Sequence, residues 1–324
     1  MIRRNILCAL GASLIAATFG AMAQAPKYPA RPVKVVVPWP AGGNADITTR
    51  AVINEMSNTF GQPLVVENLP GASGANGTAQ AAKAAHDGYT LVMLASISTI
   101  NVSLVKNAPF DLIKDFEPVG MITSTSLALV VPASLPVRSV KELIEYARAR
   151  PNGATFASAG VGTGGHLTAE LFKKSTKLPM VHVPYKGAAP AVNDLMGGHV
   201  DMFFDTLPSA MTYAKSGKLR ILAVTDTRRS DLIPDVPTFV ELGLPDLVVS
   251  VWTALAAPAG TDPEIVSRVN SELNRALRDK AVVQRLAAIG SVPQQSSPEQ
   301  FRSFIRSEVS KWAEVVKSAG ITPE

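Results

Sequence analysis

The 324-residue chain is 47% apolar and 18% charged, and its formal net charge at pH 7 is +5. This composition is typical of a globular protein with a large core, and it excludes a disordered or fibrous chain. The length predicts about two domains, and the lack of a dense Lys and Arg cluster with interleaved aromatic residues argues against a nucleic-acid partner.

The first 23 residues have the three parts of a secretory signal peptide. Arg3 and Arg4 form a basic start, an apolar stretch follows over residues 6–19, and Ala-Met-Ala at 21–23 is an A-x-A cleavage signal. We expect cleavage after Ala23. The alternative is a transmembrane anchor, which needs about 20 consecutive apolar residues, more than this stretch offers.

The predicted mature chain contains no cysteine, because Cys8 lies inside the signal peptide. Without Arg3 and Arg4 the chain carries 29 basic and 26 acidic residues, a mild net charge of +3. A large core makes disulfides unnecessary in an exported protein of this size. The sequence therefore predicts a periplasmic protein.

From Pro32 onward, short β-branched segments alternate with helical patterns, which predicts parallel strands covered by helices. In a first unit we expect strands at 34–37, 64–67 and 89–95 and helices at 46–60 and 75–85. In a second unit we expect strands at 127–131, 154–157, 180–183, 200–204 and 219–224 and helices at 165–174, 189–196 and 208–216. A further helix begins after Ser139, with Glu142 three residues later as in a capping box, and ends at 151–153.

The C-terminal third contains one long apolar run, over 247–256, and then three helices. Thr261 with Glu264 is expected to cap the first of them, and Ser297 with Gln300 begins the last. This region has too few strands to form a domain alone, so we expect it to pack on the first unit.

The chain would then pass between two lobes twice, near 121–126 and near 225–240. The predicted division is a signal peptide at 1–23, a first lobe made of 24–124 with 236–324, and a second lobe at 125–235.

The motifs give little support for a cofactor or for catalysis. The stretch GVGTGG at 160–165 fits G-x-G-x-x-G, but the segment after it, HVPYKGA, has no carboxylate to bind a ribose. No G-K-[ST] and no G-x-S-x-G pattern occurs. The four histidines, His86, His166, His182 and His199, are scattered and lack metal-ligand spacing. We therefore expect neither a cofactor nor a metal.

Small polar residues and glycines follow successive predicted strands. They are Ala41, Gly42, Gly43 and Asn44; Gly71 to Gly74 with Asn76; Ser96, Ser98 and Thr99; Ser158, Gly160 and Thr163; and Asp205 with Thr206. Ligands of open α/β sheets bind outside the carboxyl ends of the strands, so two such sets on two lobes predict a cleft. Glycine-bearing loops at helix N-termini present backbone N–H groups, which favour an anion. For the serines, plain helix capping is the alternative.

Several long stretches together resemble one known family. They are YPARPVKVVVPWPAGGNADITTR, VENLPGASGANG, SAGVGTGGHLTAELF, VPYKGAAPAVNDLMGGHVDMFFD, VPTFVELGLP and APAGTDPEIVSRVNSELNRAL. These stretches are similar to the Bug family, the extracytoplasmic solute receptors of tripartite tricarboxylate transporters, over nearly the whole mature chain. The resemblance implies an α/β fold of the type II periplasmic binding protein class. Such a fold has two doubly wound lobes, an interlobe cleft and two hinge crossings, with no catalysis and no cofactor.

The resemblance also implies a small carboxylate in the cleft, held largely by main-chain amides and bridging waters. The loop 38–46 would take a carboxylate, with Gly42 and Gly43 offering N–H groups and Asp46 ordering the helix start. The full expected ligand set is Pro38, Ala41, Gly42, Gly43, Asn44, Asp46, Ser73, Ser96, Thr99, Ser158, Gly160, Thr163, His166, Tyr185 and Asp205. This chain departs from the family at Asn44, where a smaller residue is usual, and at Trp39, which replaces a common Phe. Lys186 would pair with a second carboxylate or remain a solvated loop residue.

Three functions follow, in order of preference. The first is a monomeric transport receptor that closes on a small organic acid and delivers it to the membrane permease subunits of a tripartite transporter. The second is a receptor that presents its ligand-bound form to a periplasmic sensor kinase. The third is a periplasmic hydrolase, with His166 as the best candidate base and a cleft serine as nucleophile.

Overall fold

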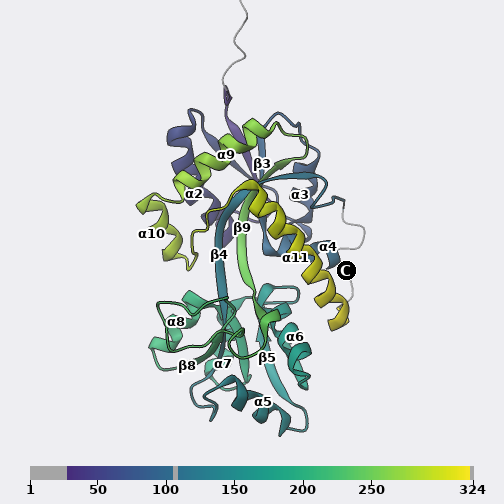
Figure 1. Ribbon diagram of the computed structural model, residues 1–324, viewed down its shortest axis with the longest axis vertical. Coiled ribbons are helices and arrows are strands. Elements are labelled where there is room, and N and C mark those ends of the chain that lie inside the picture. The colour runs from purple at the N-terminus through teal and green to yellow at the C-terminus, as the bar shows by residue number, and fades with distance from the viewer. Residues whose placement is uncertain (1–27, 105–108, 322–324) are drawn as a thin grey trace, which may run out of the picture.

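The structure is a computed structural model that describes residues 28–104 and 109–321. Two α/β lobes lie one above the other along the long axis of the molecule, and two long strands, β4 and β9, run between them (Figure 1). The predicted signal peptide and its cleavage site lie outside the described residues. The strands are β1 (Val33–Val37), β2 (Leu64–Asn68), β3 (Thr90–Ala95), β4 (Phe116–Pro132), β5 (Ala154–Ser158), β6 (Met180–Pro184), β7 (Met202–Thr206), β8 (Leu219–Val224) and β9 (Ser250–Pro258).

The helices alternate with these strands along the chain. They are α2 (Asn44–Phe60), α3 (Ala75–Ala82), α4 (Ser96–Leu104), α5 (Val140–Arg148), α6 (Gly164–Thr176), α7 (Ala188–Met196), α8 (Leu207–Lys215), α9 (Pro263–Ala276), α10 (Lys280–Ala288) and α11 (Pro298–Ala319), with short 3₁₀ turns η1 (Ala72–Gly74) and η2 (Pro245–Leu247). The predicted alternation is confirmed. Helix α4 is not predicted by the sequence, because its Ser and Thr residues resemble a polar loop after β3.

In the first lobe, β1 pairs in parallel with both β2 and β3, as predicted for a βαβαβ unit. The antiparallel strand β9 continues this sheet from β3 to β4. Helix α2 packs with α9 and α10 over one core, and α3 with the start of α11 covers another. The carboxyl ends of β1, β2 and β3 therefore lead directly into α2, η1 with α3, and α4.

In the second lobe, β5 pairs in parallel with β6 and β7. Strand β4 pairs antiparallel with β7 on one side and with β8 on the other. Each parallel strand again leads into a helix, namely α6, α7 and α8. The second lobe thus has its own set of helix N-termini at the carboxyl edge of its strands.

Strand β4, one of the two strands that join the lobes, is longer than the sequence predicts. Residues 121–126, where the sequence predicts a crossing between the lobes before a strand at 127–131, already form the middle of β4, which pairs with β9 from Phe116 to Ser126. Their Ser and Thr side chains fit a strand because they bond across the pair, as the hydroxyls of Thr123 and Thr253 do at 2.7 Å. The prediction for β4 was therefore too short at its N-terminal end.

Thr225 fixes the point where the chain returns from the second lobe. Its buried hydroxyl accepts from the N–H of Leu127 at 2.8 Å and lies 2.6 Å from the carbonyl of Val249, to which it donates. Residues after 235 still pack in the second lobe, since Phe239, Leu247 and Val249 share a core cluster with β5 and β7. This packing favours a second crossing at the start of β9 over the predicted boundary at 235/236. The division into lobes stays a proposal.

Helix α11 spans both lobes. Its capping box at Ser297 and Gln300 is confirmed, and its first half packs in the first lobe through Phe301 and Ile305. Its second half contributes Trp312, Val315 and Val316 to the core cluster of the second lobe. For α9 the predicted cap was wrong, because Asp262 rather than Thr261 accepts the N–H of Glu264. No helix of the described ranges combines the length and the apolar character needed to cross a membrane.

Candidate functional site

The loop between β1 and α2 is held in place by one buried carboxylate. Asp46 Oδ2 accepts the N–H of Gly42 at 3.0 Å, and Arg50 Nε donates to both carboxylate oxygens at 3.0 Å. Burial opposes the ionisation of Asp46, but the hydrogen bonds from Arg50, Gly42 and Asn68 outweigh it and lower the pKa of this carboxyl. The carboxylate therefore stays charged and shapes the start of α2.

Asn68 connects this loop to the next one. Its side-chain amide donates to the carbonyl of Trp39 and to Asp46 Oδ1, both at 3.0 Å. Trp39 in turn packs over Gly74, where an added Cβ would lie 3.0 Å from the indole ring. Asn101 of α4 donates to the carbonyl of Ser73 at 2.9 Å. The loops after β1, β2 and β3 are thus fastened to one another.

The expectation that Gly42 and Gly43 offer free N–H groups is wrong. The N–H of Gly42 is bound to Asp46, and that of Gly43 points at the carbonyl of Pro40 at 3.3 Å. Among the described residues, the N–H groups without an acceptor begin one residue later, at residue 44. Gly43 is the N-cap of α2 and provides no side-chain cap, so the first-turn N–H groups of 44–46 have no acceptor among the residues the structure describes. With Ala41 to Asn44 all exposed, this helix start is open to a ligand.

The loop after β2 adopts a backbone conformation that side-chain-bearing residues rarely adopt. Ala72 and Ser73 have φ values of 46° and 52°, in the left-handed region. Each such residue costs about 1 kcal/mol relative to glycine. The hydrogen bond from Asn101 and the packing of Trp39 hold this exposed turn beside the start of α2.

In the second lobe the loop after β5 leads into α6. Thr163 is the N-cap, and its hydroxyl accepts the N–H of His166. The N–H groups of Gly164 and Gly165 have no acceptor within the described part of the chain. Gly165 has no room for a side chain, because an added Cβ would lie 2.6 Å from the carbonyl oxygen of Phe204 on β7. The glycine therefore lets α6 begin against the sheet, with Gly164 and Gly165 partly exposed.

Two histidines that looked scattered in the sequence touch each other behind this loop. The rings of His166 and His182 stack with centroids 3.9 Å apart, and Phe156 stacks on His182 at 4.9 Å. His166 Nδ1 accepts the N–H of Gly162 at 3.0 Å, and His182 Nε2 lies 2.6 Å from Ser158 Oγ. Burial lowers the pKa of His166 to about 4, reinforced by His182 and Lys173, and burial also lowers that of His182. Both rings are neutral at pH 7.

Ser158 is fully buried, and its Oγ is already engaged by the backbone of Gly160 as well as by His182. His166, the candidate base of the hydrolase hypothesis, contacts Gly162 and not Ser158. These contacts give Ser158 and the two histidines a role in shaping the loop, and Ser158 is not exposed as a nucleophile.

The remaining predicted residues differ in how they are placed. Ser96 and Thr99 are buried in α4, where Thr99 donates to the carbonyl of Ser96 at 2.7 Å. The hydroxyl of Tyr185 donates to Asp194 on α7 at 2.7 Å. Asp205 is 5% exposed, and its Oδ2 has no hydrogen-bond partner among the described residues. Burial raises the pKa of Asp205, so this carboxyl is the least readily ionised of the set.

The second-lobe loop contacts the first lobe at α4 and β9. An added Cβ at Gly162 would lie 3.0 Å from Leu104 Cδ1, and one at Gly164 would lie 3.4 Å from Val251 Cγ2. Ile100 of α4 belongs to the core cluster that contains Leu167 of α6. The start of α6 therefore lies beside α4, one of the three helices that follow the first-lobe strands.

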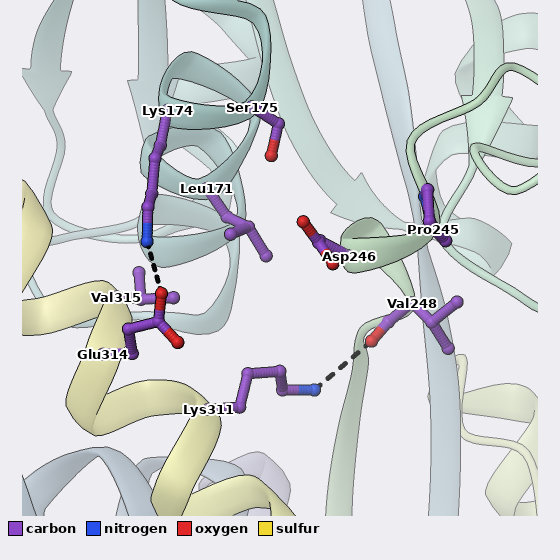
Figure 2. A pocket seen from close by; sticks show the side chains of 9 residues that line it. All are labelled: Leu171, Lys174, Ser175, Pro245, Asp246, Val248, Lys311, Glu314 and Val315. Atoms are coloured by element: carbon purple, nitrogen blue, oxygen red, sulfur yellow. Dashed lines mark hydrogen bonds and ion pairs between the residues drawn. The ribbon is translucent and has the colours of Figure 1, made fainter.

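A pocket outside this region lies between α6, η2 and α11 (Figure 2). Its charged side chains are largely paired with protein groups. Lys174 binds Glu314 at 2.7 Å, and Lys311 donates to the carbonyl of Val248 at 3.3 Å (Figure 2). This pocket lies along the contact between α11 and the second lobe. Among the residues with described positions, no group of His, Cys, Asp and Glu is arranged to hold a metal.

Two α/β lobes, joined by long strands and each carrying helix N-termini at the carboxyl edge of its sheet, define a solute-binding protein of the type II periplasmic binding protein class. The family described as tripartite tricarboxylate transporter family receptor matches residues 48–321. The chain belongs to this family, whose solved relatives are solute-binding proteins and not enzymes.

Individual relatives are similar over almost the entire chain. Protein BugT of Bordetella pertussis is 40% identical over 318 residues, covering 98% of each chain. A solved R. palustris protein with adipate is 36% identical with a TM-score of 0.74, covering 92% of this chain and 100% of that one. MatC from Rhodopseudomonas palustris with bound malate is 33% identical with a TM-score of 0.71, covering 89% and 100%.

Sequence reasoning missed several residues of the candidate site. Asn68 and Asn101 were not singled out, although each follows a predicted strand and has the side-chain amide that ties loops together. His182 was set aside because spacing along the chain cannot reveal that neighbouring parallel strands bring it to Ser158. The pairing of β5 with β6, once assumed, places Phe156 opposite His182 and would have found the cluster.

Proposed function

We propose that the protein is a periplasmic receptor that captures a small carboxylate between its lobes and delivers it to the membrane permease of a tripartite transporter. The observation that supports this most directly is the start of α2. There a rigid loop leaves the N–H groups of residues 44–46 without an acceptor in the described structure, at an exposed helix N-terminus that favours an anion.

The second lobe would complete the site with the N–H groups of Gly164 and Gly165. A hydrogen bond to a charged group contributes about 1.5–3 kcal/mol. Three or four such bonds, after the cost of ordering ligand and loops, account for about the 8 kcal/mol of a micromolar complex. Since contacts on both lobes are made only when the lobes approach, ligand binding would favour a closed form by a hinge motion at β4 and β9.

Adipate and malate, which are both dicarboxylates, support a small dicarboxylate as the ligand class. Of the expected set, the exposed residues Ala41, Gly42, Gly43, Asn44 and Ser73 would surround it in the first lobe. Pro38 and Asp46 are buried and would act by holding the loop. In the second lobe Gly160 and Thr163 are partly exposed, whereas Ser158 and His166 are buried.

A thermal-shift screen of the mature protein tests this proposal. Mono-, di- and tricarboxylates, including adipate and malate, are compared with the matching neutral amides. We expect stabilisation by at least one acid and none by its amide. A well-folded protein that no acid stabilises would contradict the proposal. Deleting the gene should abolish uptake of the same acid by the cell, which separates delivery to a permease from binding alone.

A further inference from the structure

The loop at residues 160–163 is fastened to the lobe chiefly through two imidazole rings. Gly162 is buried, and its N–H donates to His166 Nδ1 at 3.0 Å. Behind it His182 joins the stack and reaches Ser158 Oγ at 2.6 Å. Ser158 Oγ in turn accepts the N–H of Gly160 at 3.2 Å. Both ends of the loop thus depend on the same pair of rings.

We propose that His166 and His182 are positioning residues of the ligand site. Their stacked neutral rings hold the 160–163 loop so that the first N–H groups of α6 face the ligand, and adding a proton to the pair releases the loop. This inference rests on the proposed function only for the ligand. The positioning of the loop can be measured without one.

The chemistry of the contact makes it sensitive to protonation. An imidazole nitrogen that accepts a hydrogen bond carries no proton, so a proton on His166 Nδ1 would face the N–H of Gly162 and break the bond. A second proton on His182 would place two cations in rings 3.9 Å apart. The positive charge of Lys173 on α6 further lowers the pKa of both histidines.

Among the residues that the structure describes, no nearby acid is placed to reverse this effect. Glu170 lies one turn after His166 on α6, but burial raises its pKa, and Lys173 lies 3.7 Å from its carboxylate. The β5 residues against the rings, Phe156 and Ser158, do not titrate in this range. From the first lobe, the neighbour of Gly162 is the apolar Leu104.

The sign of the pH effect follows from the direction of the shifts. The pKa of His166 falls from 6.5 to about 4 in the folded protein, so an opened loop binds more protons than a closed one. The closed loop is therefore fully favoured above the ordinary histidine pKa and loses stability as the pH falls from 6.5 toward about 4.

Two variants separate the hydrogen bond from the ring stack. His166→Asn keeps an acceptor near the position of Nδ1 but cannot titrate. His166→Phe keeps a stacked ring but has no acceptor, so the N–H of Gly162 is left unpaired. A single lost hydrogen bond of this kind corresponds to about a tenfold change in an equilibrium constant.

The first measurement is amide hydrogen exchange of residues 158–166 without ligand, from about pH 7.5 to about pH 4.5. Residues 40–50 serve as the internal control. In the wild type we expect protection at 158–166 to fall in acid while that at 40–50 holds. His166→Phe should lose about tenfold protection at neutral pH, and His166→Asn should retain protection with a flatter pH profile. Equal protection in all three proteins at every pH would overturn the proposal.

The second measurement is the Kd for adipate and for malate over the same pH range. We expect wild-type affinity to weaken in acid and His166→Phe to bind about tenfold more weakly at neutral pH. His166→Asn should bind more tightly than His166→Phe at neutral pH, and its Kd should change less in acid than that of the wild type. If exchange behaves as expected but the wild type binds neither these nor any acid of the thermal-shift screen, the proposed function fails while the positioning role stands. If acids bind with the same Kd and pH profile in all three proteins, the positioning role fails.

Discussion

In the first lobe the loop before α2 is held by a carboxylate, whereas in the second lobe the loop before α6 is held by an imidazole. The Asp46 carboxylate accepts the N–H of Gly42, and the side chains of Arg50 and Asn68 also donate hydrogen bonds to it. His166 binds Gly162, and His182 and Phe156 stack behind it. The same result, an ordered glycine loop at a helix start, is reached with ionic contacts in one lobe and aromatic ones in the other.

This difference gives the two loops different responses to acid. The pKa of Asp46 lies below its usual value of 3.8, so its contribution to stability is present at higher pH and is lost only as the pH falls through that low value. The histidine contribution already declines below 6.5. Between about pH 6 and about pH 4 the second lobe is therefore the acid-sensitive half of the site.

The largest effect in this comparison is expected from Gly165→Ala. The added Cβ would lie 2.6 Å from the carbonyl oxygen of Phe204, so α6 must move away from β7. We expect a loss of about 1–3 kcal/mol in the free energy of unfolding and weaker ligand binding. Gly164→Ala is the matched control, because its nearest contact at 3.4 Å is an ordinary one. Equal denaturation midpoints for the two variants would show that the close contact does not constrain α6.

A smaller loss is expected from Asp46→Asn. The new amide would place a donor against Arg50 Nε and against either Gly42 N–H or Asn68 Nδ2, so at least one hydrogen bond fails. We expect a loss of about 1 kcal/mol in the free energy of unfolding, for the one hydrogen bond that fails, and about a tenfold weaker Kd. Asp111→Asn serves as the control, since Asp111 also accepts main-chain N–H groups, in a separate loop. Comparable weakening of ligand binding by both would contradict a local role for Asp46.

The smallest change in stability is expected from Gly43→Ser, which tests the free N–H groups of α2 most directly. Gly43 has extended backbone angles, φ −75° and ψ 166°, that serine adopts readily, and a hydroxyl there would cap the free N–H groups of α2. We expect a gain of a few tenths of a kcal/mol in stability together with weaker ligand binding. Gly43→Ala tests the same position without the hydroxyl. If the serine variant binds the acid as tightly as the alanine variant, those N–H groups do not contact the ligand.

The order of strands and helices could largely be predicted, because β-branched segments, caps and glycines mark each element locally. The predicted caps at Ser139 and Ser297 are confirmed, because the hydroxyl of each serine accepts the N–H of the third residue of its helix. What failed depends on pairing between distant segments. The polar middle of β4 is a strand only because β9 lies beside it, and α4 forms where its Ser and Thr residues bond within the helix.

The candidate site shows the same limit. The sequence indicated the loops in which α2 and α6 begin, because glycines and small polar residues after strands are a local signal. It did not indicate which N–H groups are free, since that depends on which of them the Asp46 carboxylate accepts, and it accepts the N–H of Gly42. It also missed the histidine stack, which exists only because β5 and β6 are neighbours in the sheet.

Helix α11 has a mechanical consequence. Phe301, near the N-terminal end of α11, is buried in the first lobe, and Trp312, in its second half, is buried in the core cluster of the second lobe. Lys174 of α6 also forms an ion pair with Glu314 near the C-terminal end of α11. The lobes therefore have a third attachment besides the paired strands, offset to one side of them (Figure 1). Two paired strands alone would allow one lobe to twist as well as bend relative to the other. We expect the packing of α11 on both lobes to oppose twisting, so that any opening of the lobes is mainly a bend about β4 and β9.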